Sequence, residues 1–119
     1  MKTVKITTDN KISIIDVDFN DFRSIQKAIG NGSFETVKTR KMWDYFKQPI
    51  MLICDEEGHC KGLPINRFGS WLYDTEKHGW PIAGDIILAV PYGPEILGLE
   101  NAAQIYVKLL DDFAYLEEA

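Results

Sequence analysis

Short apolar segments separated by turn residues open the chain. Residues 3–8 and 11–17 are rich in Val, Ile and Thr, and the pair Asp9-Asn10 between them is typical of a tight turn. Because β-branched residues favour extended backbone, this pattern predicts an antiparallel hairpin.

A helical pattern follows the hairpin. Asp18 or Asn20 supplies its cap, and Gly30 and Gly32 supply its stop. Its apolar positions recur at helical spacing near one face: Phe19, Phe22, Ile25 and Ile29. We expect this helix to pack on the hairpin.

Two strands are predicted in the middle of the chain. Residues 33–39 alternate imperfectly, whereas residues 50–54 are a continuous apolar run typical of a buried strand. The polar turn 55–58 and a short return at 59–61 predict a second hairpin. Residues 41–47 fit either a strand or a helix.

The last part of the chain contains the clearest helical pattern. Its apolar positions recur every three or four residues: Leu99, Ala102, Tyr106, Leu109, Phe113 and Leu116. Before it, residues 66–73 predict a short helix, residues 74–79 a loop, and residues 85–90 a central strand that ends at Pro91. No internal repeat or linker is present. We therefore predict one α+β domain over residues 1–119, with a mainly antiparallel sheet of two hairpins plus the central strand, an N-terminal helix and a C-terminal amphipathic helix.

Charge is distributed unevenly. The net charge is −5, but residues 1–49 hold nine Lys and Arg against six Asp and Glu, while residues 50–119 hold four against twelve. Because binding to nucleic acid polymers depends on neutralising phosphates, an acidic chain disfavours that partner class. No run approaches the roughly 18 apolar residues of a membrane span. Residues 1–5 lack the apolar core of a signal peptide, so we expect a cytoplasmic protein.

The cysteines and histidines form no recognisable motif. Together Cys54, His59, Cys60 and His78 could supply four zinc ligands, but paired Cys-x-x-Cys knuckles are absent. If residues 55–58 form a hairpin loop, Cys54 lies opposite His59, which also disfavours a disulfide. We expect free thiols, no metal and no cofactor. No sequence motif pairs a nucleophile with a base, so we expect no enzymatic activity.

One stretch combines cations with aromatic rings. Its basic residues are Lys38, Arg40, Lys41 and Lys47. Proteins that bind single-stranded nucleic acid combine such basic residues with aromatic rings like that of Trp43. The alternative is ordinary strand packing, with Trp43 and Tyr45 on one face and Met42 and Phe46 on the other. We favour the alternative, because Asp44 and the acidic second half oppose long polyanions.

Residues 61–73 are predicted to hold a ligand site. Lys61 and Arg67 offer cations for a phosphate, and Asn66 offers a polar edge. Three nearby aromatic rings could stack on a flat ligand: Trp71, Tyr73 and Trp80. The alternative is structural, with Asn66 capping the short helix, Arg67 paired with an acid such as Asp85, and Trp71 in the core.

The same part of the chain resembles a known family. The runs that carry the resemblance are residues 52–58, 61–67 and 84–87. They are similar to small proteins from phages, plasmids and other bacterial mobile elements that are catalogued only as a domain of unknown function. The segments 40–48 and 74–81 depart from the family pattern, and the C-terminal helix matches only in outline. The resemblance implies mobile-element ancestry in a host bacterial cytosol and transfers no activity.

Two functions are consistent with these patterns. The leading hypothesis is a non-catalytic accessory protein that binds a small phosphorylated, nucleotide-like ligand and sequesters a bacterial immune signal, since a sponge needs tight binding without turnover. The alternative is an inhibitor of a host protein that uses an acidic surface. The acidic residues of the C-terminal helix are Asp111, Asp112, Glu117 and Glu118. A homo-oligomer is compatible with either function.

Overall fold

The computed structural model describes the backbone of residues 1–117 and the side chains of residues 1–113. Within this part, strands and helices follow one another in the order β1 (Lys2–Ile6), β2 (Ile12–Asp16), α1 (Phe22–Ala28), β3 (Phe34–Val37), α2 (Arg40–Phe46), β4 (Met51–Asp55), α3 (Arg67–Tyr73), α4 (Thr75–His78), β5 (Ile86–Tyr92), β6 (Glu95–Leu97) and α5 (Ala102–Glu117).

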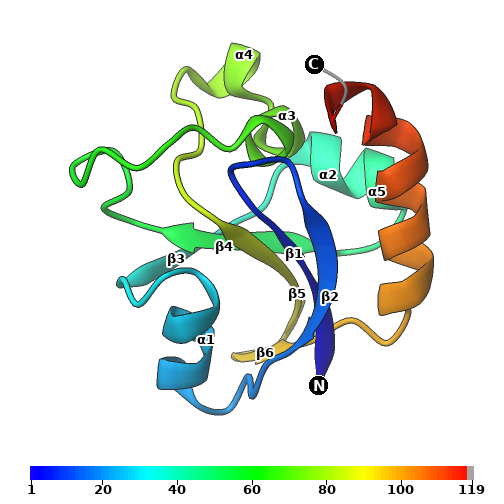
Figure 1. Ribbon diagram of the computed structural model, residues 1–119. Helices are drawn as coiled ribbons and strands as arrows, with labels where there is room; N and C mark the ends of the chain where they lie inside the picture. Colours follow the sequence, from blue (N-terminus) through cyan, green and yellow to red (C-terminus); the bar gives the residue numbers. More distant parts are fainter. Residues whose placement is uncertain (118–119) are drawn as a thin grey trace.

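The strands form one antiparallel sheet, in the order β2-β1-β5-β4-β3, with β6 added to the far end of β5 (Figure 1). Strand β5 lies in the centre, where Ile87 pairs with Lys5 of β1 on one side and with Ile53 of β4 on the other. Residues Ile86–Ala89 are buried, which explains why this strand is apolar on both of its faces.

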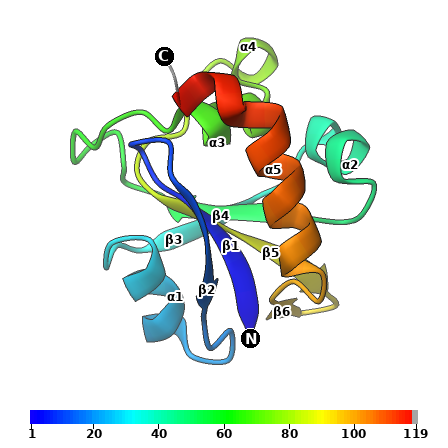
Figure 2. The ribbon, with the colours of Figure 1, turned by 45° about the vertical axis from the view of Figure 1, so that its right-hand side comes forward.

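Helices cover both faces of the sheet. Helix α1 lies on one face, whereas α2, α3 and α5 lie on the other (Figures 1 and 2). Strand β4 shows the consequence of this arrangement, because Leu52 faces the larger core beneath the three helices and Ile53 faces the core beneath α1. Since side chains alternate along a strand, a strand covered on both sides must be apolar throughout.

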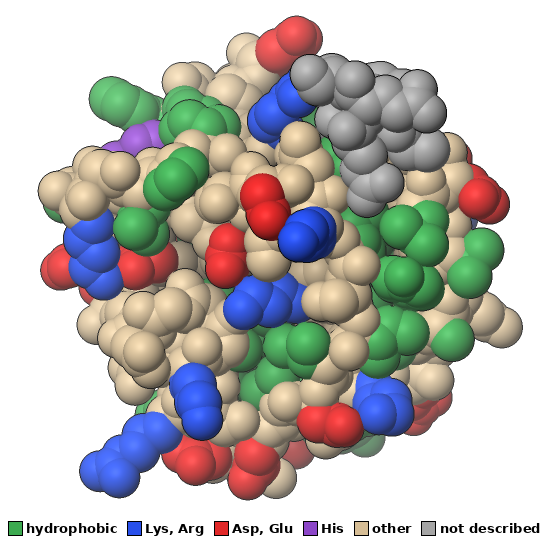
Figure 3. Space-filling model, viewed as in Figure 1, with side chains coloured by type: hydrophobic (Ala, Val, Ile, Leu, Met, Phe, Trp, Pro, Cys, Tyr) green, Lys and Arg blue, Asp and Glu red, His purple; other side chains and the backbone are tan. Residues whose placement is uncertain are grey.

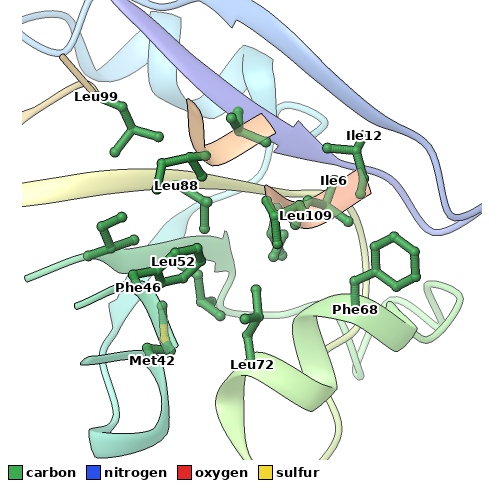
Figure 4. Close-up of a cluster of buried hydrophobic side chains, with 14 of the residues drawn as sticks. Ile6, Ile12, Met42, Phe46, Leu52, Phe68, Leu72, Leu88, Leu99 and Leu109 are labelled. Carbon is green, nitrogen blue, oxygen red and sulfur yellow. The ribbon is translucent and has the colours of Figure 1, made fainter. Parts of the chain in front are cut away.

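The larger core joins residues that are far apart in sequence. Phe68 and Leu72 of α3 belong to one cluster with Leu109 of α5 and with Ile6 and Leu88 of the sheet (Figure 4). Helices of seven residues, such as α2 and α3, are too short to be stable alone in water. Their stability therefore depends on these tertiary contacts.

The predicted fold class is confirmed, as are the opening hairpin, the central strand and the C-terminal helix. One detail of the first helix was wrong. Its cap is Asp21, whose side chain accepts from the Arg23 backbone N–H at 2.9 Å, rather than Asp18 or Asn20. The buried side chains of Ile25 and Ile29 share a cluster with Ile15 and Val17 of the hairpin as well as with residues of β4 and β5, and α5 contacts the hairpin too.

The predicted second hairpin is wrong. Residues after β4 form successive turns, in which the Lys61 N–H donates to the Glu57 carbonyl at 3.0 Å. Both edges of β4 are occupied by β3 and β5, so no edge remains for a return strand. As a result, Cys54 lies opposite Glu35 of β3 rather than opposite His59.

Two further boundaries differ from the predictions. Strand β5 continues through Pro91, which pairs with Ile96 of β6. Proline is tolerated there because β5 has passed the end of the central sheet, where its last β4 partner is Met51 opposite Ala89. The predicted loop 74–79 contains the short helix α4.

The segment 41–47 is helical, which resolves the ambiguity in its sequence. The Thr39 hydroxyl caps α2 by accepting from the Met42 N–H, and Lys47 ends it in the left-handed conformation, with φ 59°. The predicted strand alternation is therefore wrong. Helical spacing instead buries Met42 and Phe46 together and turns Trp43 outward.

Helix α5 presents Ala102, Ile105, Leu109 and Phe113 to the core. The predicted face residue Leu116 and the predicted contact side chains of Glu117 and Glu118 lie outside the described side chains. Within the described residues, no helix is long and apolar enough to cross a membrane.

Candidate functional site

The six predicted ligand residues do not form one site. Lys61 is held by a carboxylate: its Nζ atom donates to Oδ2 of Asp55 at 2.7 Å, and the Asp55 side chain is only 2% exposed. This hydrogen bond raises the pKa of Lys61. Gly32 lies directly over the pair, since a Cβ atom there would fall 2.2 Å from Oδ2 of Asp55. The lysine thus compensates a buried charge.

Asn66 is fully buried and has a structural role. Its Oδ1 atom accepts from the Gly69 N–H at 2.8 Å, which caps α3. Its amide donates to the carbonyls of Ile6 and Gly84, each at 3.0 Å. Both amide hydrogens are used, so Asn66 has no donor left for a ligand.

Arg67 is the first residue of α3, and its side chain is exposed. The suggested pairing with Asp85 is wrong. Asp85 instead lies 3.7 Å from Nζ of Lys5 and accepts from the Thr8 N–H at 3.0 Å. The hollows described below are lined by other residues.

Trp71 is 38% exposed and belongs to an aromatic cluster. Its ring lies edge to face against Tyr45 and Phe113, at centroid distances of 5.3 and 5.1 Å. The Nζ atom of Lys41 lies 4.0 Å from the Trp71 ring centroid. This cation–π contact occupies the ring face that a flat ligand would need.

Tyr73 and Trp80 line what we call the acidic hollow, a space of about 160 Å³ that also contains Glu35, Asp55 and Glu56. Asp55 is paired with Lys61, but the carboxylates of Glu35 and Glu56 would repel a phosphate. Trp80 is 72% exposed and lies against the ring of His59, and Tyr73 stacks on His78 with a centroid distance of 5.0 Å. Tyr73 and Trp80 therefore line the same hollow, but the carboxylates beside them do not suit the phosphorylated ligand that the sequence predicts.

The thiols are separate. Cys54 is buried and its thiol lies 3.7 Å from Oε1 of Glu35, whereas Cys60 is exposed in the turn. Burial and then the nearby Glu35 raise the pKa of Cys54 to about 12, so the thiol is neutral and a poor nucleophile at pH 7. Among the described residues, no three His, Cys, Asp or Glu side chains are grouped to hold a metal ion.

A different hollow combines an aromatic ring with positive charge. We call it the Trp43 hollow; it measures about 400 Å³ and is lined by Lys38, Thr39, Arg40, Trp43, Pro49, Ile50 and Pro91. It lies where β3 ends, α2 begins and β4 begins, with Pro91 contributed by β5. No carboxylate is among these lining residues. Trp43 is 53% exposed, and the two prolines provide rigid apolar walls.

A neighbouring space shares one wall with the Trp43 hollow. We call it the His78 hollow; it measures about 300 Å³ and is lined by Arg40, Lys41, Asp44, Asp74, Lys77 and His78. Arg40 lines both hollows. Its Nε atom lies 3.9 Å from Oδ2 of Asp44, one turn further along α2.

The signal that points to the Trp43 hollow was present in the sequence, because its cations and its ring are near neighbours in the basic aromatic stretch. Strand alternation would have placed Trp43 in a packed face. Only the helical conformation, with Met42 and Phe46 turned inward, leaves the Trp43 ring at the surface beside Lys38 and Arg40.

Comparisons with known proteins identify a family but no characterised relative. Residues 1–111 match DUF3846, a domain of unknown function. No curated protein and no solved structure matches the chain. Since the family match covers nearly the whole chain, the protein belongs to the DUF3846 family.

Proposed function

We propose that this protein is a non-catalytic binding module for a small phosphorylated, nucleotide-like ligand, which it holds in the Trp43 hollow. The observation that carries the proposal is the lining of this hollow, which combines Lys38, Arg40 and the exposed ring of Trp43 and includes no acidic residue, although Asp44 approaches Arg40 at 3.9 Å from outside the lining. This site replaces the one predicted around Arg67.

Size and chemistry favour a nucleotide over a simple anion. A space of about 400 Å³ falls within the range of about 300–1,000 Å³ that is usual for small-molecule sites. The Trp43 ring offers a stacking surface worth roughly 1–3 kcal/mol for a base. Lys38 offers a mobile ammonium and Arg40 a planar fork for phosphate oxygens.

The hydroxyl in the hollow supports binding over catalysis. Thr39 Oγ1 donates to the Leu72 carbonyl at 3.2 Å and accepts from the Met42 N–H at 3.3 Å. The proton of this hydroxyl is directed at a backbone carbonyl, which is not a base that could activate it as a nucleophile.

The biological setting is part of the proposal. The resemblance to small proteins of phages and other mobile elements favours an accessory protein that acts in the cytosol of a bacterial host. A module that binds tightly without turnover would sequester a nucleotide signal of anti-phage immunity, acting as a sponge in stoichiometric amounts.

Calorimetry against a nucleotide panel tests the proposal. The panel holds adenosine and guanosine monophosphates, ADP-ribose and cyclic dinucleotides, with adenosine as the control that lacks phosphate. We expect at least one phosphorylated member to bind with a Kd below about 10 μM, equivalent to roughly −7 kcal/mol. We expect Trp43→Ala to weaken it about 10- to 100-fold, with partial rescue by Trp43→Phe.

Matched variants distinguish the Trp43 hollow from the site that the sequence predicted around Arg67. Lys38→Gln and Arg40→Gln should each weaken binding and flatten its salt dependence, because each removes a phosphate contact. Arg67→Gln and Trp80→Ala should leave the Kd within about twofold. If no phosphorylated nucleotide binds below about 10 μM, or if Trp43→Ala binds as the wild type does, the proposal is wrong.

A second candidate function is inhibition of a host protein. One observation favours it: hydrophobic side chains gather over α5, where Val107 is 54% exposed (Figure 3). The acidic helix face is a weaker argument, because Asp112 already accepts from the Tyr45 hydroxyl at 2.6 Å and pairs with Lys108 at 3.5 Å. Retention of one host protein from lysate, lost with Val107→Lys and unchanged at high salt, would favour this candidate over nucleotide binding.

A further inference from the structure

The His78 hollow lies beside the Trp43 hollow, and Arg40 is the wall between them. A guanidinium presents five donors in a planar fork and can therefore bind two phosphate groups on its two sides. The side chain of Arg40 is 89% exposed, and its contact with Asp44, at 3.9 Å, is long for an ion pair. Its terminal nitrogens are thus not fixed by a short carboxylate contact.

Charge in the His78 hollow is partly compensated, but a positive excess remains. Lys41 pairs with Asp74 at 3.9 Å, and both side chains are largely buried, while Arg40 approaches Asp44. The lining therefore holds three cations, Arg40, Lys41 and Lys77, against the two carboxylates of Asp44 and Asp74. Lys77 is the lining cation that remains unmatched within this described hollow, and His78 adds an N–H donor in either protonation state.

The fold holds Lys77 and His78 in place. The Asp74 carbonyl accepts from the N–H groups of Lys77 and His78 at 3.0 and 3.1 Å, which starts α4 directly after α3. The Thr75 hydroxyl donates to the Ser70 carbonyl at 3.1 Å, and the His78 ring stacks on Tyr73 with an interplanar angle of 30°. Through these contacts, both the backbone of α4 and the ring of His78 are held against α3, so this side of the hollow is fixed in place.

Resting on the proposed function, we infer that the ligand carries two separate phosphate groups joined through a nucleoside. The base stacks on Trp43 with one phosphate between Lys38 and Arg40, and the second phosphate reaches past Arg40 to Lys77 and His78. A mononucleotide occupies only the Trp43 hollow. The acidic hollow is excluded as the second subsite, because the carboxylates of Glu35 and Glu56 in its lining would repel the phosphate, while Asp55 is already paired with Lys61.

Two probes that differ by one phosphate test the inference: adenosine 5′-monophosphate and adenosine 3′,5′-bisphosphate, together with a cyclic dinucleotide as the longer bis-phosphate. In calorimetry with the wild type, we expect at least one of the two-phosphate probes to bind 10-fold or more tightly than the monophosphate. Because both phosphates belong to one molecule, binding of the first raises the effective concentration of the second at its subsite. The gain in affinity should therefore exceed the gain from adding free phosphate to the complex with the monophosphate.

Variants locate the second phosphate. Lys77→Gln and His78→Gln should each reduce the two-phosphate advantage by about 3- to 10-fold and leave the monophosphate Kd within twofold. Lys27→Gln, which removes an exposed lysine of α1 on the other face of the sheet, is the charge-matched control and should change neither Kd.

The possible failures are distinguishable. If the monophosphate binds at Trp43 and the two-phosphate probes bind equally well, the inference is wrong while the proposed function stands. The same holds if Lys77→Gln weakens both kinds of probe to the same degree. If none of these probes binds, the inference is wrong, and the proposed function falls with it when the rest of the nucleotide panel also fails to bind.

Discussion

Asn66 offers the sharpest test of the distinction between structural and ligand-binding residues. In the fold it makes three buried hydrogen bonds, one as the cap of α3 and two through its amide to carbonyls of Ile6 and Gly84. Loss of an N-cap costs about 1 kcal/mol, and each lost buried hydrogen bond costs about 1 kcal/mol or more when its partner is left unsatisfied. We therefore expect Asn66→Ala to lower the free energy of unfolding by about 3 kcal/mol.

Urea titration followed by circular dichroism measures this change, and thermal unfolding provides a second readout. At an unfolding entropy of about 2.1 cal/mol/K per residue, a 119-residue chain loses about 4 °C in Tm for each kcal/mol, so Asn66→Ala should lower Tm by roughly 12 °C. The neighbouring exposed residue provides the control, since Arg67→Ala should change stability by less than about 0.5 kcal/mol.

Asn66→Asp separates the cap from the amide contacts. Aspartate caps helices as well as asparagine does, so a residue that serves only as a cap would tolerate the change. In this site the new carboxylate oxygen would face two carbonyl oxygens in a buried space, and we expect a loss at least as large as that of Asn66→Ala. A loss below about 1 kcal/mol for either variant would refute this account of the residue.

The surroundings of other side chains predict further measurable outcomes. Gly32→Ala places a methyl group 2.2 Å from Oδ2 of Asp55, so we expect a loss of about 1–3 kcal/mol in urea titration, and unchanged stability would contradict the close approach. A thiol reagent at pH 8 should label Cys60 in the folded chain and Cys54 only after denaturation, because burial and a neighbouring glutamate raise the pKa of Cys54 to about 12; rapid labelling of both thiols would argue against this. A hydrogen bond from a tyrosine hydroxyl holds the pKa of Asp112 in the folded chain below its ordinary value of 3.8. The stability that Asp112→Asn removes should therefore be fully present above pH 3.8 and should be lost as the pH falls through the lower pKa of the folded state. A constant difference between the two proteins down to pH 2 would contradict that linkage.

Elements with local signals were predictable from the sequence. The opening hairpin has β-branched strands and a two-residue turn signal within 15 residues, and α5 repeats its apolar spacing over several turns. The second hairpin failed because strand pairing is not a local property. Nothing within residues 55–61 reveals that β3 and β5 already occupy both edges of β4.

The predicted site failed for a related reason. The carbonyls that accept from Asn66 lie 60 and 18 residues away in sequence, so its burial depends on how α3 meets the sheet. Lys61 is neutralised by Asp55 across a turn whose course was predicted incorrectly. In contrast, Trp43 could have been found by treating the basic stretch as a helix, because that spacing separates its ring from Met42 and Phe46.

The central position of β5 has a consequence for how the chain reaches its folded state. Strands β1 and β2 are complete within the first 16 residues, and β3 pairs with β4 before residue 56, yet in the described sheet β5 is the strand that joins the two pairs. During synthesis, the sheet therefore cannot be completed until residues 86–90 are available, and an isolated two-stranded pair is at best marginally stable in water. Bringing Lys5 to Ile87 closes a loop of about 80 residues, and long-range closures of this kind slow folding. During that interval the inner edges of β1 and β4 are unpaired, which makes the nascent chain most vulnerable to aggregation just before its central strand is synthesised.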